Sequence, residues 1–108
     1  MIGVIFQYLD ELIEVRVDGK SIFFRDHPNH PFVPFENLRL NQDGVIKEFP
    51  QLKDNENWRK EAIELFRIKL MSMRNEDEIV KYIIEDLSKW GYVPLFKQKA
   101  GFRPEKII

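Results

Sequence analysis

The dipeptide Asp18-Gly19 is the feature that most constrains the fold, because it separates two runs of strand-forming residues. In the run Leu12 to Val17, apolar residues alternate with charged ones, which is the period of a half-buried strand. The run Ser21 to Arg25 is rich in aromatic and β-branched residues. Asp-Gly between two such runs favours a type I′ turn, whose two central residues both need a positive φ. The sequence therefore predicts an antiparallel β-hairpin here.

Further strands are expected on both sides of this hairpin. Residues 2–8 form a β-branched and aromatic run that predicts a preceding strand. The runs 37–40 and 45–49, joined by the polar segment 41–44, predict a second hairpin with a longer loop. Between the hairpins, in residues 26–35, prolines repeat every third residue, which is the period of polyproline II. That period predicts a stiff, extended crossover.

The second half of the chain carries two helical patterns. Apolar residues recur at helical spacing from Trp58 to Arg74, and Asn57 stands at the position of an N-cap. Asn75 opens a second helix that has acidic residues in its first turn and is followed by Gly91. Residues 92–96 indicate a returning strand. Together these elements predict an α+β fold: an N-terminal antiparallel β-meander, two amphipathic helices packed on the sheet, and a short C-terminal strand or hairpin.

Length and composition indicate a single domain that comprises residues 1–108. Hydrophobic residues make up 44% and charged residues 32% of the chain, a balance that buries one core. The sequence contains no cysteine, which excludes disulfides and thiolate chemistry and favours a cytoplasmic location. The apolar run at residues 1–9 is too short to span a membrane and lacks the flanks of a signal peptide, so no membrane association is expected.

The net charge of −1 is distributed unevenly. Residues 1–57 contain ten acidic and six basic residues, whereas residues 89–108 contain five basic residues and one acidic residue. In this C-terminal segment cations interleave with phenylalanines, a combination that stacks bases and neutralises phosphates. The alternative is a last strand whose phenylalanines are core and whose lysines face solvent. The candidate nucleic-acid contacts are Phe96, Lys97, Lys99, Phe102, Arg103 and Lys106.

The candidate metal ligands are Asp26, His27 and His30, which are of the types that zinc takes. In an extended crossover the Cα atoms of the two histidines lie about 9 Å apart, so both rings would have to lean toward one ion. No third or fourth ligand is evident from the sequence. We therefore expect two solvated histidines, and neither a metal nor a cofactor.

Catalytic patterns are weak. The triplets 14–16 and 18–20 loosely resemble the acid and base pairs of nucleases, but their residues already have places in the hairpin. Ser21, Ser72 and Ser88 do not stand in a nucleophile elbow, and no glycine-rich loop precedes a helix. No catalytic or cofactor-binding residue is predicted, and an enzyme with an unrecognised site is the last of three functional interpretations.

Each helix carries more apolar surface than one sheet face covers. Beyond the main apolar stripes lie Ile68 and Met71 in the first helix and Tyr82 and Ile84 in the second. These four residues predict an interface, either in a homodimer or with another protein; a helix enclosed between the sheet and the C-terminal segment is the alternative. The leading interpretation is a non-enzymatic binding or accessory protein that acts through this contact, and a nucleic-acid-binding protein is the second.

Overall fold

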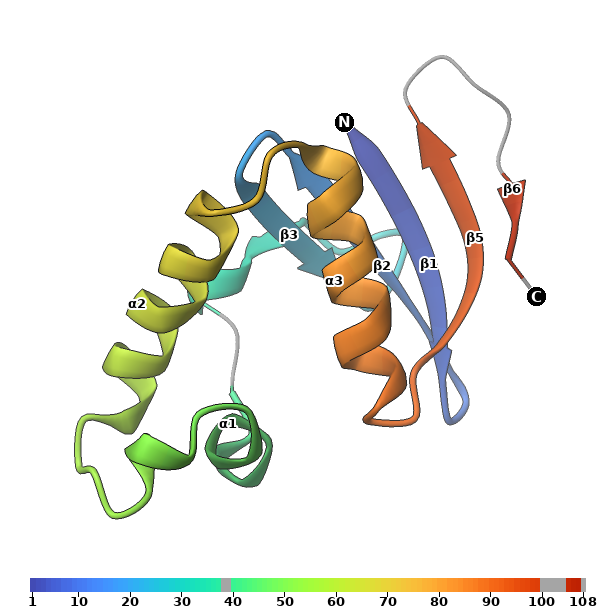
Figure 1. Ribbon diagram of the computed structural model, residues 1–108. Helices are drawn as coiled ribbons and strands as arrows, with labels where there is room; N and C mark the ends of the chain where they lie inside the picture. Colours follow the sequence, from blue (N-terminus) through green and yellow to red (C-terminus); the bar gives the residue numbers. More distant parts are fainter. Residues whose placement is uncertain (38–39, 100–104, 108) are drawn as a thin grey trace.

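The computed structural model describes residues 1–37, 40–99 and 105–107 (Figure 1). Within these residues one antiparallel sheet has six strands in the order β4-β3-β2-β1-β5-β6. The strands are β1 Ile2–Tyr8, β2 Glu11–Asp18, β3 Ser21–Arg25, β4 Val33–Pro34, β5 Val93–Lys99 and β6 Glu105–Lys106. The helices are α1 Gln42–Glu48, α2 Trp58–Met71 and α3 Glu76–Ser88, with the short 3-10 helices η1 Phe35–Asn37 and η2 Pro50–Leu52. The predicted α+β fold, with N-terminal strands, helices and a C-terminal strand, is confirmed.

The hairpin between β2 and β3 is present, but its turn lies one residue later than predicted. Asp18 pairs with Ser21, so the two loop residues are Gly19 and Lys20. Gly19 has a φ of +60°, whereas Lys20 does not have a positive φ. This pattern differs from the type I′ turn that Asp18-Gly19 predicted and fits a type II′ turn, which takes glycine at its first central position.

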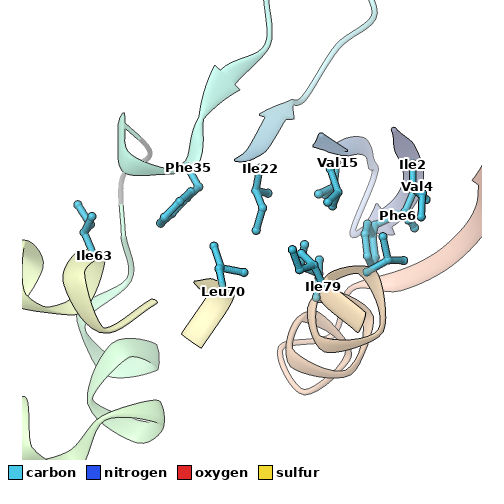
Figure 2. Packing of buried hydrophobic residues seen from close by; sticks show 12 residues of the cluster. Ile2, Val4, Phe6, Val15, Ile22, Phe35, Ile63, Leu70 and Ile79 are labelled. Atoms are coloured by element: carbon cyan, nitrogen blue, oxygen red, sulfur yellow. The ribbon is translucent and has the colours of Figure 1, made fainter. Parts of the chain in front are cut away.

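The main core lies between one face of the sheet and the helices (Figure 2). Because side chains alternate along a strand, one face of β1 to β3 presents its apolar residues to α3 and α2. Figure 2 shows the cluster extending from Ile63 on α2, past Leu70 and Ile22, to Ile79 and Phe6. The buried members are Ile2, Val4, Phe6, Val15, Val17, Ile22, Phe35, Ile63, Leu70, Ile79, Val80 and Ile83. We call this set the larger cluster.

A smaller cluster lies under α1 and consists of Val45, Phe49, Leu52 and Ala62. Here the predicted second hairpin is wrong, because residues 45–48 are helical and Phe49 ends the helix. The side chain of Asn41 accepts a hydrogen bond of 3.0 Å from the backbone N–H of Gly44, so segment 41–44 starts a helix instead of forming a hairpin loop. Residues 38–39 of the expected strand 37–40 lie outside the described residues.

The predicted polyproline II crossover is wrong in its first half. Residues 27–30 form a turn in which the N–H of His30 donates to the carbonyl of His27 at 3.0 Å. The N–H of Asn29 donates to Nδ1 of the His27 ring at 3.1 Å. Polyproline II forms no internal hydrogen bonds, so this turn satisfies backbone groups that an extended chain would leave to solvent. In the second half, Val33–Pro34 pair with β3 as β4, and Phe35 then begins η1.

The two long helices begin where the sequence predicts. At the start of α3, the side chain of Asn75 accepts a hydrogen bond of 3.0 Å from the N–H of Glu78. At its end, Gly91 has a φ of +87°, and the N–H of Tyr92 donates to the carbonyl of Leu87 at 3.2 Å, as in a Schellman motif. The start of α2 differs, because the side chain of Asn57 makes no cap hydrogen bond. Among the described helices, none combines the length and apolar character that crossing a membrane requires.

The β2–β3 turn also fixes the connection between α2 and α3. The ammonium of Lys20 donates to the carbonyl of Leu70 at 3.2 Å, near the end of α2, and also to the carbonyl of Met73. The N–H of Gly19 donates to the carboxylate of Glu76 at 2.7 Å, at the start of α3. Both helices are therefore tied to the sheet at one end, and they diverge from that end (Figure 1).

Candidate functional site

A pocket of about 650 Å³ lies between the sheet and the helices. Its apolar walls come from three elements that are distant in sequence. The principal apolar residues are Ile22 and Phe24 of β3, Phe66 and Leu70 of α2, and Ile83 and Leu87 of α3. Ligand sites in proteins have this range of volume and this mainly apolar lining, with a few polar groups among the apolar ones. The pocket is therefore the candidate binding site of the chain.

Arg25 borders the pocket, but its guanidinium is bound elsewhere. The strand register places Glu14 directly opposite Arg25 on the sheet face that points away from the larger cluster. Nε and Nη2 of Arg25 both donate to Oε1 of Glu14, at 2.9 Å and 2.7 Å. Nη1 donates to the carbonyl of Pro28 at 3.0 Å, and the guanidinium carbon lies 4.4 Å from the centre of the Phe32 ring. The positive charge of Arg25 is thus compensated outside the pocket.

Asp26 and His30 also border the pocket, where they bind each other. Nδ1 of His30 lies 2.7 Å from Oδ1 of Asp26, and this hydrogen bond lowers the pKa of Asp26. The turn brings the rings of His27 and His30 to 5.2 Å between centres. Within the described residues, no three histidine, cysteine, aspartate or glutamate side chains are grouped so that they could hold one metal ion. Of the three candidate metal ligands, Asp26 and His30 therefore form an exposed hydrogen-bonded pair, and the ring of His27 lies beside this pair.

A group of charged side chains lies at the end of the pocket nearest α1. Glu48 at the end of α1 binds the ammonium of Lys69 from α2, and this contact lowers the pKa of Glu48. The hydroxyl of Tyr82 lies 3.5 Å from Oε1 of Glu48. Asp86 follows Tyr82 by one helical turn, and both side chains line the pocket. We call Glu48, Lys69, Tyr82 and Asp86 the acidic corner.

Asp86 is the half-buried carboxylate of this corner. Its pKa is raised, first by burial and then by the negative charge of Glu48. Lys69 and Lys89 act on it in the opposite direction at longer range. Burial, together with the charges of Asp86 and Glu48, also raises the pKa of Tyr82. Within the described residues Asp86 forms no ion pair, whereas Glu48 is paired with Lys69.

The nucleic-acid candidates are divided between the two faces of the sheet. Phe96 is exposed on the outer face, with Lys106 opposite it on β6. Because strand side chains alternate, Lys97 and Lys99 point to the other face, where their ammonium groups lie 4.0 Å and 2.9 Å from Oδ1 of Asp77. Phe102 and Arg103 lie outside the described residues.

The interface candidates are also divided. Ile68 and Met71 are 64% and 71% exposed on α2. Ile84 packs partly against the larger cluster, and Tyr82 lies on the wall of the pocket. Of the four predicted interface residues, the two that remain exposed are therefore those on α2.

Sequence reasoning did not identify the acidic corner. One signal was present, because Tyr82 and Asp86 lie one helical turn apart and directly precede Ile83 and Leu87 of the apolar stripe. The role of Glu48 was hidden, because residues 45–49 were assigned to a strand. Comparisons of the chain with protein-family models, curated proteins and solved structures give no match.

Proposed function

We propose that this protein is a non-enzymatic binding protein whose pocket between the sheet and the helices holds the apolar part of a ligand. The observation that supports this proposal is the pocket itself, about 650 Å³ in a chain of 108 residues. Protein interiors are closely packed and leave few voids larger than a water molecule. A mainly apolar volume of this size is therefore a binding site of the ordinary kind, and not a packing defect.

The test uses Nile red, an uncharged dye whose fluorescence rises in apolar surroundings. Leu87→Trp should fill part of the pocket and weaken dye binding about tenfold, which corresponds to ~1.4 kcal/mol. The matched control is Leu12→Trp, because Leu12 is exposed on β2 and does not line the pocket. The control should bind the dye like the unchanged protein. Equal binding by both variants would contradict the proposal.

Self-association through α2 is a second candidate, and it is supported by the exposure of Ile68 and Met71. Two such helices that pack face to face would form a two-fold dimer, in which each copy contributes the same surface. Light scattering at micromolar concentration should then give a mass near twice 13.0 kDa. Ile68→Lys should return the mass to that of one chain, while the circular dichroism spectrum stays that of the folded protein. A single-chain mass for the unchanged protein would exclude this candidate.

Binding of single-stranded nucleic acid through the C-terminal segment stays a prediction with less support. Phe96 and Lys106 share the outer face of the sheet, but Lys97 and Lys99 lie near Asp77 on the other face. Each phosphate contact to a single strand contributes about −0.7 to the slope of log affinity against log salt. We expect fluorescence anisotropy with labelled single strands to give a shallow slope, and Phe96→Ala to weaken any binding more than Lys106→Ala does.

A further inference from the structure

The charges around the pocket indicate the chemical class of its ligand. The guanidinium of Arg25 is bound by Glu14, and Asp26 is bound by His30. Neither of these charges needs a partner from a ligand. Of the charged side chains that line the pocket, Asp86 is the one for which the described residues supply no ion pair.

The acidic corner carries more negative than positive charge. Its two carboxylates, Glu48 and Asp86, face a single bound ammonium, that of Lys69. Lys89 caps the C-terminal end of α3, but it is exposed, so its charge is screened by water. A half-buried carboxylate is stabilised by a cation that approaches from the pocket side, and within the described residues no cationic side chain forms an ion pair with Asp86.

The acidic corner also offers aromatic faces to a cation. The ammonium of Lys69 lies 4.9 Å from the centre of the Tyr82 ring and 5.4 Å from that of the Phe49 ring. Ammonium groups are attracted to such faces within about 6 Å of the ring centre. One protein ammonium therefore already occupies the kind of environment that a ligand ammonium would find beside Asp86 and Tyr82.

We propose that the pocket binds an apolar amine, with its ammonium group against the Asp86 carboxylate and its apolar body between β3, α2 and α3. This inference rests on the proposed binding function and adds the class of ligand. An anionic head group would lie against Asp86, with Glu48 close behind it, and is disfavoured by their charges. A neutral head group gains the apolar contacts and at most one hydrogen bond, without an ion pair.

The experiment compares three molecules with the same tail, each below its micelle concentration, as competitors for bound Nile red at neutral pH. Decylamine should compete about tenfold better than decanol, because its ammonium adds an ion pair with Asp86, whereas decanol can donate only an uncharged O–H to the same carboxylate. Decanoate should compete least well. The ratio of decylamine to decanol affinity is read from the unchanged protein, so the inference can fail even if a variant does not fold.

Two matched variants test whether the preference for decylamine over decanol depends on Asp86. Asp86→Asn should reduce the ratio of decylamine to decanol affinity to near one and leave decanol affinity unchanged. Glu85→Gln removes the neighbouring exposed carboxylate on α3 and should leave the ratio as it is. If decanol competes but decylamine has no advantage, or if the advantage survives in Asp86→Asn, the inference is wrong and the binding function stands. If neither the dye nor decanol binds, the binding function itself fails, and the inference fails with it.

Discussion

The two hydrophobic clusters are assembled in different ways. The larger cluster joins strands of the sheet to α3 and α2, and its central side chains, Phe6, Val15 and Ile79, are fully buried. The smaller cluster joins neighbouring segments, from α1 through η2 to the start of α2, and Phe49 within it is 7% exposed. Strand register holds the first in place, whereas local helical turns hold the second. Segments with few long-range contacts open at lower free energy than the core of a sheet.

The pocket lies at the boundary between these clusters. Leu40 and Phe66 pack against both clusters, and both residues also line the pocket. One wall therefore belongs to the sheet, and part of the opposite wall belongs to α2, the helix that carries Ala62 of the smaller cluster. We expect the second wall to adjust to a ligand while the first stays fixed.

The largest expected effect is on the larger cluster. Phe6→Ala removes a ring that has 0% exposure and should lower the free energy of unfolding by about 3–5 kcal/mol, measured by urea denaturation. Leu12→Ala on the exposed side of β2 is the control and should change it by less than ~0.5 kcal/mol. If Phe6→Ala lowered the free energy of unfolding by less than ~1 kcal/mol, the larger cluster would not be the more tightly packed of the two.

The smaller cluster is tested by Leu52→Ala, which should lower the free energy of unfolding by about 2 kcal/mol, at the low end for such a substitution. The sharper expectation concerns where the protein loosens. Hydrogen exchange should accelerate for amides of α1 and η2 while those of β1 keep their protection. Equal acceleration in β1 would mean that both clusters open as one unit.

The two long helices provide a smaller comparison of the same kind. Asn75→Ala removes the side-chain cap of α3 and should lower the free energy of unfolding by about 1 kcal/mol. Asn57→Ala should change it far less, because the Asn57 side chain makes no cap hydrogen bond at the start of α2. The two melting temperatures, measured side by side, check this difference. A similar loss in both variants would argue against the helix starts as described.

The smallest expected effect is a dependence of the melting temperature on pH, which arises from Asp86 and Glu48 at the boundary between the clusters. Burial raises the pKa of Asp86 above its ordinary value of 3.8, so folding favours the protonated form, and this stability is lost as the pH rises through the raised pKa. Asp86→Asn should therefore raise the melting temperature at neutral pH and have little effect below pH 3.8. Lys69 lowers the pKa of Glu48, so Glu48→Gln should lower the melting temperature at neutral pH. Melting curves across pH that show the same sign for both variants would refute this assignment.

The parts of the fold that were predicted correctly are those whose sequence patterns lie within one short segment of the chain. The alternation along β2 and β3 together with Gly19 specifies a hairpin, and Asn75 with Gly91 specifies the two ends of α3. These signals depend on backbone geometry that one local segment sets by itself. No information from the rest of the chain was needed to interpret them.

The segment that became α1 was predicted wrongly because a short apolar run fits both a strand and a helix. Val45 and Phe49 are four residues apart, which places them on one side of a helix. Gly44 suggested a turn, but its missing side chain has a packing role, since a Cβ there would lie 3.2 Å from the ring of Trp90. Trp90 follows α3, and nothing local to residue 44 indicates that contact.

The acidic corner could not be predicted for the same reason. Glu48, Lys69 and Asp86 come from three different helices, and their distances depend on how α1 packs against α2 and α3. A strand at residues 45–49 would not place Glu48 beside Asp86. The apolar pattern of one helix predicts Tyr82 as an interface residue, whereas packing from a distant segment makes it part of a pocket wall.

The shortness of β4 and β6 has a consequence for how this protein avoids aggregation. A long exposed edge strand offers unpaired backbone groups to any passing chain and so templates fibril-like growth. Within the described residues, each of these outer strands is two residues long, and Pro34 in β4 has no backbone N–H to donate to an added strand. Contacts between copies through the two edges of this sheet are therefore disfavoured. Mutations that lengthen β4 or replace Pro34 should promote insoluble assembly before they change the folded state.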